Sequence, residues 1–364
     1  MRRMKLVVVM LVAAILVACG GGGSNEPAKP KFSKQVSFGD SLSDVGSYKV
    51  GLVAGLGGGQ FTINIAGTPT NWTELTAVQF GLAAPCAHET GLDNGSGAAP
   101  GIPAGTVIDP VFNTACTGYA QGGARVTSPV GIGNKLLGGG GFALTVPVAT
   151  QIANHLAAGG GSFNGDEIVF VMAGANDIFF QAATVVDGPT QLAAVTAVQT
   201  AATELAGYIQ TQMLDKGAKY IVVMNVPDIS STPQVTSIAD PTTRAQTKAL
   251  FDALVGTFNA TLKTGLDAMD PAKVLQVDAF TASGDEVANP AKYNLTNVTS
   301  TACNLTAPSP NPLASSLACN STNLNTGVTA SDHYLFADNV HPTPYGHALF
   351  ATYVLQEMVN KGWF

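Results

Sequence analysis

Long apolar runs, basic clusters and tryptophan are all scarce in this sequence. The N-terminal apolar run, residues 6–18, has thirteen residues, fewer than the ~20 that a helix needs to cross a bilayer. Because no cluster of basic residues occurs, nucleic acid is not an expected partner. Trp72 and Trp363 are the only tryptophans, so the aromatic platforms typical of sugar-binding sites are not expected. No Cys-x-x-Cys or His-x-x-x-His spacing occurs either, so the sequence predicts no metal site and no cofactor.

The first residues have the pattern of a targeting segment. The apolar run follows three basic residues, Arg2, Arg3 and Lys5. It ends at residues 16–19, Leu-Val-Ala-Cys, which resemble the lipobox of bacterial lipoproteins. The resemblance implies that residues 1–18 are a signal peptide and that lipidated Cys19 anchors the protein to a membrane. Gly20 replaces the aspartate typical of inner-membrane lipoproteins, so we expect the outer membrane, on its periplasmic or outer side; the alternative is cleavage and secretion.

The rest of the chain has the size of one globular domain. Removing residues 1–18 leaves 346 residues and takes the formal charge from −7 to −10, because three basic residues and no acidic ones are lost. We expect residues 19–33 to be a flexible tether, since glycine and proline dominate them. Residues 34–364 then form a single domain with a full core and with insertions at residues 47–117 and 281–335.

Cysteine is also rare, but its number is informative. Besides Cys19 the chain has four cysteines, Cys86, Cys116, Cys303 and Cys319. An even number in an exported chain indicates disulfides, and three pairings are possible. We favour the local pairing, Cys86 with Cys116 and Cys303 with Cys319. The alternative is that all four are buried thiols.

Apolar strands alternate with helical segments along the domain. The strands are expected at residues 35–38, 167–172, 220–226 and 274–280. The helices are expected at residues 71–82, 146–158, 190–214, 241–269 and 343–361. This order predicts an α/β fold with a parallel central sheet that is covered on both faces. Residues 84–117 are expected to be an ordered loop held by two cysteines, and residues 281–335 a polar insertion rich in turns.

The stretch that carries the chemistry is Phe38-Gly39-Asp40-Ser41-Leu42. Gly39 permits a tight turn after the first strand. We expect Ser41 to stand at the start of a helix, where free backbone N–H groups favour an oxyanion. A strand, a turn with serine and a helix together expose a nucleophile. The alternative is a plain β-turn in which the serine caps a helix.

Three further stretches match a known pattern in order and spacing. They are Gly174-Ala175-Asn176-Asp177, Asp338-Asn339-Val340-His341-Pro342 and residues 119–124. With the Gly-Asp-Ser-Leu stretch they resemble the blocks of the GDSL esterases and lipases, also called SGNH hydrolases. The resemblance covers the chain from Val36 to its end and implies a three-layer α/β/α sandwich with a parallel central sheet. The second block departs from the pattern, because glycine stands at position 118 where asparagine is usual.

The resemblance assigns roles to particular residues. Ser41 is the expected nucleophile, His341 its base, and Asp338 the carboxylate that fixes the tautomer of His341. His333 is the rival base, while His347 is expected either on the surface of the closing helix or in its packing. Asp40 and Asp44 are expected to brace the turn.

The oxyanion hole is expected to combine the N–H groups of Ser41 and Gly123 with the side-chain amide of Asn176. The departure at position 118 leaves Gly122 as an alternative to Gly123. For Asn176 the alternative is a cap at the start of a helix.

The expected activity is ester hydrolysis through an acyl-enzyme. The motifs resemble the secreted bacterial branch grouped with phospholipases and haemolysins, which implies a lipid or lipid-like ester as substrate. Phe179, Phe180 and the apolar, glycine-rich stretch 50–67 are candidates for the acyl-facing wall. The alternatives are a carbohydrate or short-chain acetyl esterase, an acyltransferase, and a surface binding protein without catalysis.

Overall fold

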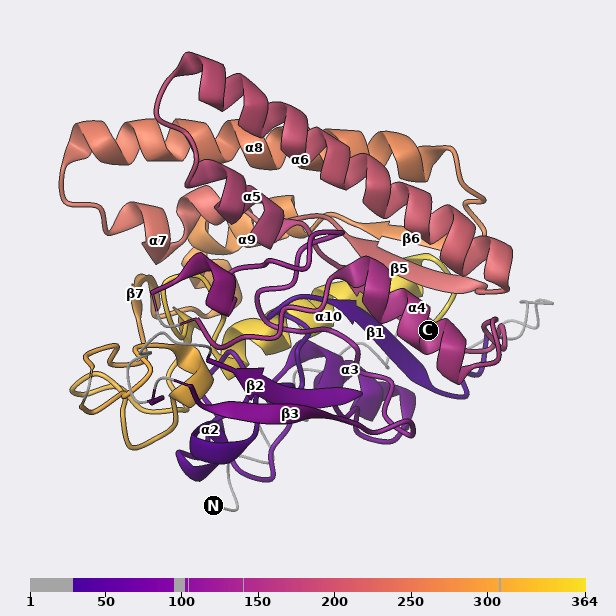
Figure 1. Cartoon of the computed structure of the whole chain (residues 1–364), viewed down its shortest axis with the longest axis horizontal. Helices are drawn as coiled ribbons and strands as arrows, with labels where there is room; N and C mark the ends of the chain where they lie inside the picture. The colour runs from indigo at the N-terminus through magenta and orange to yellow at the C-terminus, as the bar shows by residue number, and fades with distance from the viewer. Residues whose placement is uncertain (1–28, 95–101, 104, 140, 308) are drawn as a thin grey trace.

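The computed structural model describes residues 29–94, 102–103, 105–139, 141–307 and 309–364 (Figure 1). The expected signal peptide and Cys19 lie outside the described residues. Within the described part, no helix combines the length and the apolar character that crossing a membrane requires.

A parallel sheet of four strands forms the centre of the fold. Its strands are β1 (Gln35–Gly39), β4 (Ile168–Met172), β5 (Tyr220–Met224) and β6 (Val274–Val277), in the spatial order β1-β4-β5-β6. All four expected strands are confirmed, because their continuous apolar runs suit strands that are buried on both faces. The last strand is shorter than predicted.

Side chains that alternate along the strands divide the core into two layers. On one face, Phe38, Val171 and Val223 pack in a cluster with residues of four helices. These helices are α4 (Val148–Ala158), α5 (Ala175–Ala182), α6 (Gly188–Tyr208) and α8 (Pro241–Asp267). The other face packs against α3 (Trp72–Phe80) and α10 (Pro344–Asn360). The result is the expected three-layer α/β/α arrangement, with α6 and α8 side by side over one face (Figure 1).

Most of the predicted helices begin where polar side chains accept their first N–H groups, whereas α4 begins after Pro147 without such a cap. Asn71 and Glu74 form a capping box at α3, and Asp240 accepts a hydrogen bond from Thr243 N–H at α8. The helix predicted over 190–214 is α6, which passes into a π-turn at Ile209–Met213 and a 3₁₀ turn at Leu214–Lys216.

Several short elements were not predicted from the sequence. Residues 84–117 were predicted to be a loop, yet β2 (Glu89–Asp93) and β3 (Val107–Phe112) pair there antiparallel. Strand β6 ends at Val277 because Asp278 caps a helix, α9 (Ala279–Ala288), whose Thr281 N–H it accepts. The insertion 281–335 therefore begins inside a helix and ends in strand β8. The remaining elements are α2 (Gly51–Gly55), α7 (Pro233–Thr236), β7 (Asn297–Thr301), β8 (Tyr334–Phe336) and the 3₁₀ turns Lys135–Leu137, Ile229–Ser231, Pro290–Tyr293 and Ser316–Ala318.

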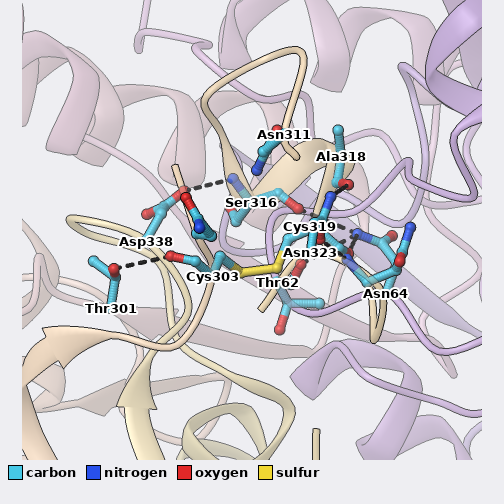
Figure 2. Close-up of a disulfide and its surroundings, with 12 residues drawn as sticks. Thr62, Asn64, Thr301, Cys303, Asn311, Ser316, Ala318, Cys319, Asn323 and Asp338 are labelled. Atoms are coloured by element: carbon cyan, nitrogen blue, oxygen red, sulfur yellow. Dashed lines mark hydrogen bonds between the residues drawn. A yellow bond between two sulfur atoms is a disulfide. The ribbon is translucent and has the colours of Figure 1, made fainter. Parts of the chain in front are cut away.

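Both disulfides have the expected local pairing. Cys86 is bonded to Cys116 with 5.1 Å between their Cα atoms, and Cys303 to Cys319 with 6.0 Å. The N–H of Cys303 also donates to the carbonyl of Ala337, which follows β8 directly and precedes Asp338. The second disulfide therefore ties the loop that contains Cys319 to the segment that leads into Asp338 (Figure 2).

Candidate active site

Two distant motifs meet where β1 and β4 end. Gly39 and Met172, the last residues of the two strands, are paired in the sheet. A Cβ on Gly39, whose φ is +147°, would lie 2.0 Å from the carbonyl oxygen of Met172, so no larger residue fits this approach. The motifs that follow, with Ser41 and Asn176, therefore lie at the carboxyl edge of the sheet, where α/β proteins bind ligands.

Ser41, His341 and Asp338 form a chain of hydrogen bonds. The Oγ of Ser41 lies 2.8 Å from Nε2 of His341. On the other side of the ring, Nδ1 lies 2.9 Å and 2.8 Å from the two carboxylate oxygens of Asp338. An ionised carboxylate only accepts hydrogen bonds, so Nδ1 carries the hydrogen and Nε2 is left to accept from the Ser41 hydroxyl.

Asp338 is buried and is held as an anion. Its Oδ1 accepts from the N–H groups of Val340 and His341, at 3.0 Å and 2.8 Å. Its Oδ2 accepts from the N–H of Ser316 at 3.1 Å, across the Cys303–Cys319 loop (Figure 2). Burial alone would raise the pKa of Asp338, but His341 and these donors outweigh it and hold the pKa below its ordinary value. The carboxylate stays charged while it orients His341.

The segment around Ser41 is a turn, and the helix predicted to start there is absent. Ser43 N–H donates to the carbonyl of Asp40, and Asp44 N–H to that of Ser41. The side chain of Asp40 accepts from Leu42 N–H at 3.1 Å. Aspartate side chains that accept local N–H groups compete with helical hydrogen bonds, which explains why no helix follows.

Asp44 connects this turn to the glycines of the second block. Its Oδ1 accepts from the N–H groups of Gly46 and Ser47, at 2.8 Å and 2.7 Å. Its Oδ2 accepts from Gly122 N–H at 2.8 Å. Burial raises the pKa of Asp44 above its ordinary value, although the three donors partly offset this effect. Asp44 therefore braces the turn, as expected, and occupies the N–H of Gly122.

The N–H groups of Ser41 and Gly123 have no hydrogen-bond partner in the described part of the chain. Gly123 has a φ of +80°, and a Cβ on it would lie 2.0 Å from the carbonyl oxygen of Ile132. The side-chain amide of Asn176 donates one hydrogen to the carbonyl of Ala124 at 3.0 Å, which fixes the orientation of the side chain. The second amide hydrogen is left free to donate to a ligand. Asn176 is the second residue of α5 and does not cap it, because Gly174 is the N-cap.

The other histidines are held away from Ser41. Nδ1 of His333 lies 2.7 Å from the carbonyl oxygen of Asn294, and its ring stacks on Tyr345 with 3.9 Å between centroids. His347 is packed inside the fold, one of the two positions expected for it, and its burial lowers its pKa to about 3. His341 is therefore the histidine that faces Ser41.

Three contributors to the site were not identified from the sequence. Gln151 on α4 exchanges two hydrogen bonds with the backbone of Gly39, at 2.9 Å and 2.8 Å. The ring of Phe61 lies 5.0 Å from that of His341. Ser316 contributes its backbone N–H to Asp338. Each contact joins distant parts of the chain, so local sequence patterns do not indicate it. Only Phe61 had a sequence signal for a place in the site, because it lies in the apolar stretch 50–67.

A cavity of about 930 Å³ opens at Ser41 and His341. Gly123 and Asn176 also line it. Most of its wall is apolar, and it includes Phe61, Leu137, Phe142, Phe179, Val185, Leu250, Phe251, Phe336 and Phe350. Of the two phenylalanines expected at the wall, Phe179 lines it, while Phe180 stacks on the guanidinium of Arg125 at 4.2 Å. No group of three or more metal-ligating side chains gathers in the described residues.

The family model for GDSL-like lipases and acylhydrolases matches residues 36–354. The chain belongs to this family. It is therefore a hydrolase that acts on ester bonds. The sequence matches no curated protein.

Two solved structures are similar to this GDSL hydrolase over most of its length. One is LAE5, an α/β hydrolase from the metagenome of Lake Arreo in Spain. The two sequences are 14% identical, the match covers 91% of the present chain and 96% of LAE5, and the TM-score is 0.39. The other is a mutant of Axe2, an acetyl-xylooligosaccharide esterase from Geobacillus, at 15% identity, with the same coverage and a TM-score of 0.40. Neither likeness bears on the substrate of the present protein.

The position of the histidines predicts which of them activates Ser41. His341→Ala should lower kcat on a nitrophenyl ester on the order of a millionfold, as loss of the base does in other serine hydrolases. His333→Ala, its control, should keep the wild-type rate. An active His341→Ala variant beside an inactive His333→Ala variant would reverse the assignment.

The second disulfide should support both stability and turnover. Replacing Cys303 and Cys319 together by serine should cost about 3 kcal/mol of unfolding free energy. The same replacement should also lower kcat about tenfold. Without the disulfide, the N–H of Ser316 is no longer held where it donates to Asp338, so His341 is oriented less well. The matched control replaces Cys86 and Cys116 and should cost similar stability at unchanged kcat. Urea unfolding and turnover under native conditions measure both quantities; equal kcat values in the two variants would contradict this link to Asp338.

Proposed function

We propose that this GDSL hydrolase cleaves carboxylic esters with Ser41 as nucleophile, His341 as base and Asp338 as the group that orients the base. The observation that carries the proposal is the 2.8 Å contact between Ser41 Oγ and His341 Nε2, with Asp338 behind it. As Ser41 attacks the ester carbonyl, its proton passes to His341. His341 then gives the proton to the leaving alcohol, and water releases the acid from the acyl-enzyme.

The carbonyl oxygen gains negative charge during this attack and needs donors. In the proposal these are the N–H groups of Ser41 and Gly123 and the free amide hydrogen of Asn176. The N–H of Gly122 is excluded because Asp44 already accepts it. Donors that are held in place before the reaction are worth a hundred- to a thousandfold in turnover each, on the order of what single deletions cost in other hydrolases.

We propose a lipid-like acyl group on the substrate, with phospholipid or lysophospholipid as the natural class. The apolar wall of the cavity supports this. Apolar side chains are also exposed next to wall residues: Leu136 beside Leu137 is 71% exposed, and Val186 beside Val185 is 83% exposed. Such side chains at the rim suit contact with a lipid surface.

We propose further that the protein is exported and anchored to the outer membrane through Cys19. Two disulfides suit an exported protein, because they persist in oxidising compartments. An anchor of this kind would hold the cavity near membrane lipids. The expected tether would give the domain room to approach them. It would end before residue 33, because the ring of Phe32 lies 5.3 Å from those of Phe80 and Tyr220 and already packs on the domain.

A panel of esters tests the substrate class. Nitrophenyl esters of increasing chain length, phosphatidylcholine, lysophosphatidylcholine and acetylated xylan are offered to the wild-type protein and to Ser41→Ala. The wild type should release fatty acid from a phospholipid and prefer medium or long acyl chains, since the cavity wall is apolar. Ser41→Ala should be inactive throughout.

The same panel separates the alternatives. Hydrolysis of acetyl esters alone would favour a carbohydrate or short-chain esterase. Transfer of the acyl group to added alcohol faster than to water would favour an acyltransferase. Wild-type activity equal to that of Ser41→Ala would leave only a binding function and sink the proposal.

The anchor is tested by the fate of Cys19. The wild type should partition into the detergent phase after expression in a Gram-negative host, because acyl chains are attached. Cys19→Ala should stay unlipidated and keep its signal peptide, which the mass of the larger precursor would show. A wild-type protein found wholly in the culture medium would remove the anchor and leave secretion.

A further inference from the structure

One acidic side chain on the cavity wall has no partner. Glu286 on α9 is 9% exposed and lines the same cavity as Ser41. It makes no hydrogen bond or ion pair with any described residue, and burial with the charge of Asp285 raises its pKa to about 8. A buried carboxyl group without a partner is costly, so proteins rarely keep one without a use.

The other two acids on the wall are already satisfied. Asp228 accepts hydrogen bonds from the hydroxyl groups of Ser230 and Ser231. Asp40 accepts from Leu42 N–H. No lysine or arginine lies among the described residues of the wall. The described wall therefore holds no permanently charged cation that could pair with Glu286.

Glu286 stands on helix α9, which packs beside the strand that leads to His341. Its neighbour Val287 packs against Leu335 and Phe336 of β8, and β8 leads directly into the segment of Asp338 and His341. The protonated base delivers its proton to the leaving alcohol, so the alcohol must lie next to His341. The donors proposed for the carbonyl oxygen come from other segments, the Ser41 turn, the loop with Gly123 and helix α5.

Aromatic rings that could face a cation line the same cavity as Glu286. Phe336 and Phe350 line the cavity with Glu286. Quaternary ammonium groups bind to the faces of aromatic rings, and a carboxylate adds a charge of opposite sign. An unpartnered acid, two aromatic rings and the absence of lysine and arginine from the described wall all favour the same kind of ligand.

We propose that Glu286 binds an ammonium group carried by the alcohol part of the ester, an inference that rests on the proposed function. A choline ester and the phosphocholine head group of a lipid both supply this chemistry. A neutral alcohol would leave the carboxyl group without a partner.

Other titratable groups near α9 do not replace Glu286 in this role. Lys292 and Tyr293 of the neighbouring 3₁₀ turn are bound to Asp285 on the solvent side. The Tyr345 hydroxyl on α10 donates to the carbonyl of Tyr293. His347, also on α10, is kept neutral by its burial. Asp228, beside α9, is paired as described above.

The test compares two esters of equal shape. Butyrylcholine and 3,3-dimethylbutyl butyrate differ only in a nitrogen cation that is a neutral carbon in the second. The ratio of their kcat/KM values is measured at pH 7 and pH 9 after subtraction of the uncatalysed rates. The ratio cancels effects of pH on the shared chemical step, which affect both esters equally.

Ionisation of Glu286 should raise this ratio in the wild type roughly tenfold between pH 7 and pH 9, since its pKa lies between them. Glu286→Gln should lose the rise and have a lower ratio at pH 9. Asp285→Asn removes the neighbouring half-buried acid and should keep the wild-type preference at pH 9, with the rise shifted to lower pH because the charge of Asp285 raises the pKa of Glu286. Equal ratios and equal pH profiles in the wild type and Glu286→Gln would overturn the proposal.

Two further measurements cover a variant that does not fold and identify the source of the cation. If Glu286→Gln does not fold, inhibition of the wild type by choline and by 3,3-dimethylbutan-1-ol replaces it, and equal inhibition constants would overturn the proposal. A preference for lysophosphatidylcholine over lysophosphatidylglycerol identifies the lipid head group as the source of the cation, and a preference confined to butyrylcholine identifies a small ester. If no ester is hydrolysed, the proposed function itself fails, whereas hydrolysis without any preference for a cation defeats this inference alone.

Discussion

The carboxylate of Asp338 is the contact on which the site depends. It accepts hydrogen bonds from the backbone of its own turn, from the ring of His341 and from Ser316 in the loop closed by Cys303 and Cys319. Through His341 it also determines how Ser41 is held. A single buried anion therefore joins the last insertion, the closing helix segment and the first strand, which are far apart in the sequence.

A second carboxylate does the same work on the other side of Ser41. Asp44 holds the turn after Ser41 and the N–H of Gly122 together, so the next N–H, that of Gly123, stays free. Gly39 lets β1 approach β4 closely enough to bring Asn176 to the same edge. Backbone hydrogen bonds and close strand contacts thus hold the N–H donors that have no partner next to the hydrogen-bonded Ser41 and His341.

The sequence predicted the central sheet because four apolar runs can only be buried strands in an α/β order. It also predicted the Ser41, Asp338 and His341 set, since local motifs carry these residues. It failed at the turn after Ser41, where the side chains of Asp40 and Asp44 replace helical hydrogen bonds. It missed β3 because Val107 and Val111 are exposed and show no alternation. It missed Ser316 and Glu286 because a backbone N–H and a lone acid in a helix leave no sequence pattern.

The most direct measurement of the central claim is covalent trapping of Ser41. The protein is treated with an alkyl fluorophosphonate, and peptide mass analysis locates the adduct. The account predicts one adduct, on Ser41, formed quickly in the wild type and far more slowly in His341→Ala, because the base that activates the hydroxyl is gone. An adduct on another serine, or labelling of Ser41 at the same rate in both proteins, would contradict it.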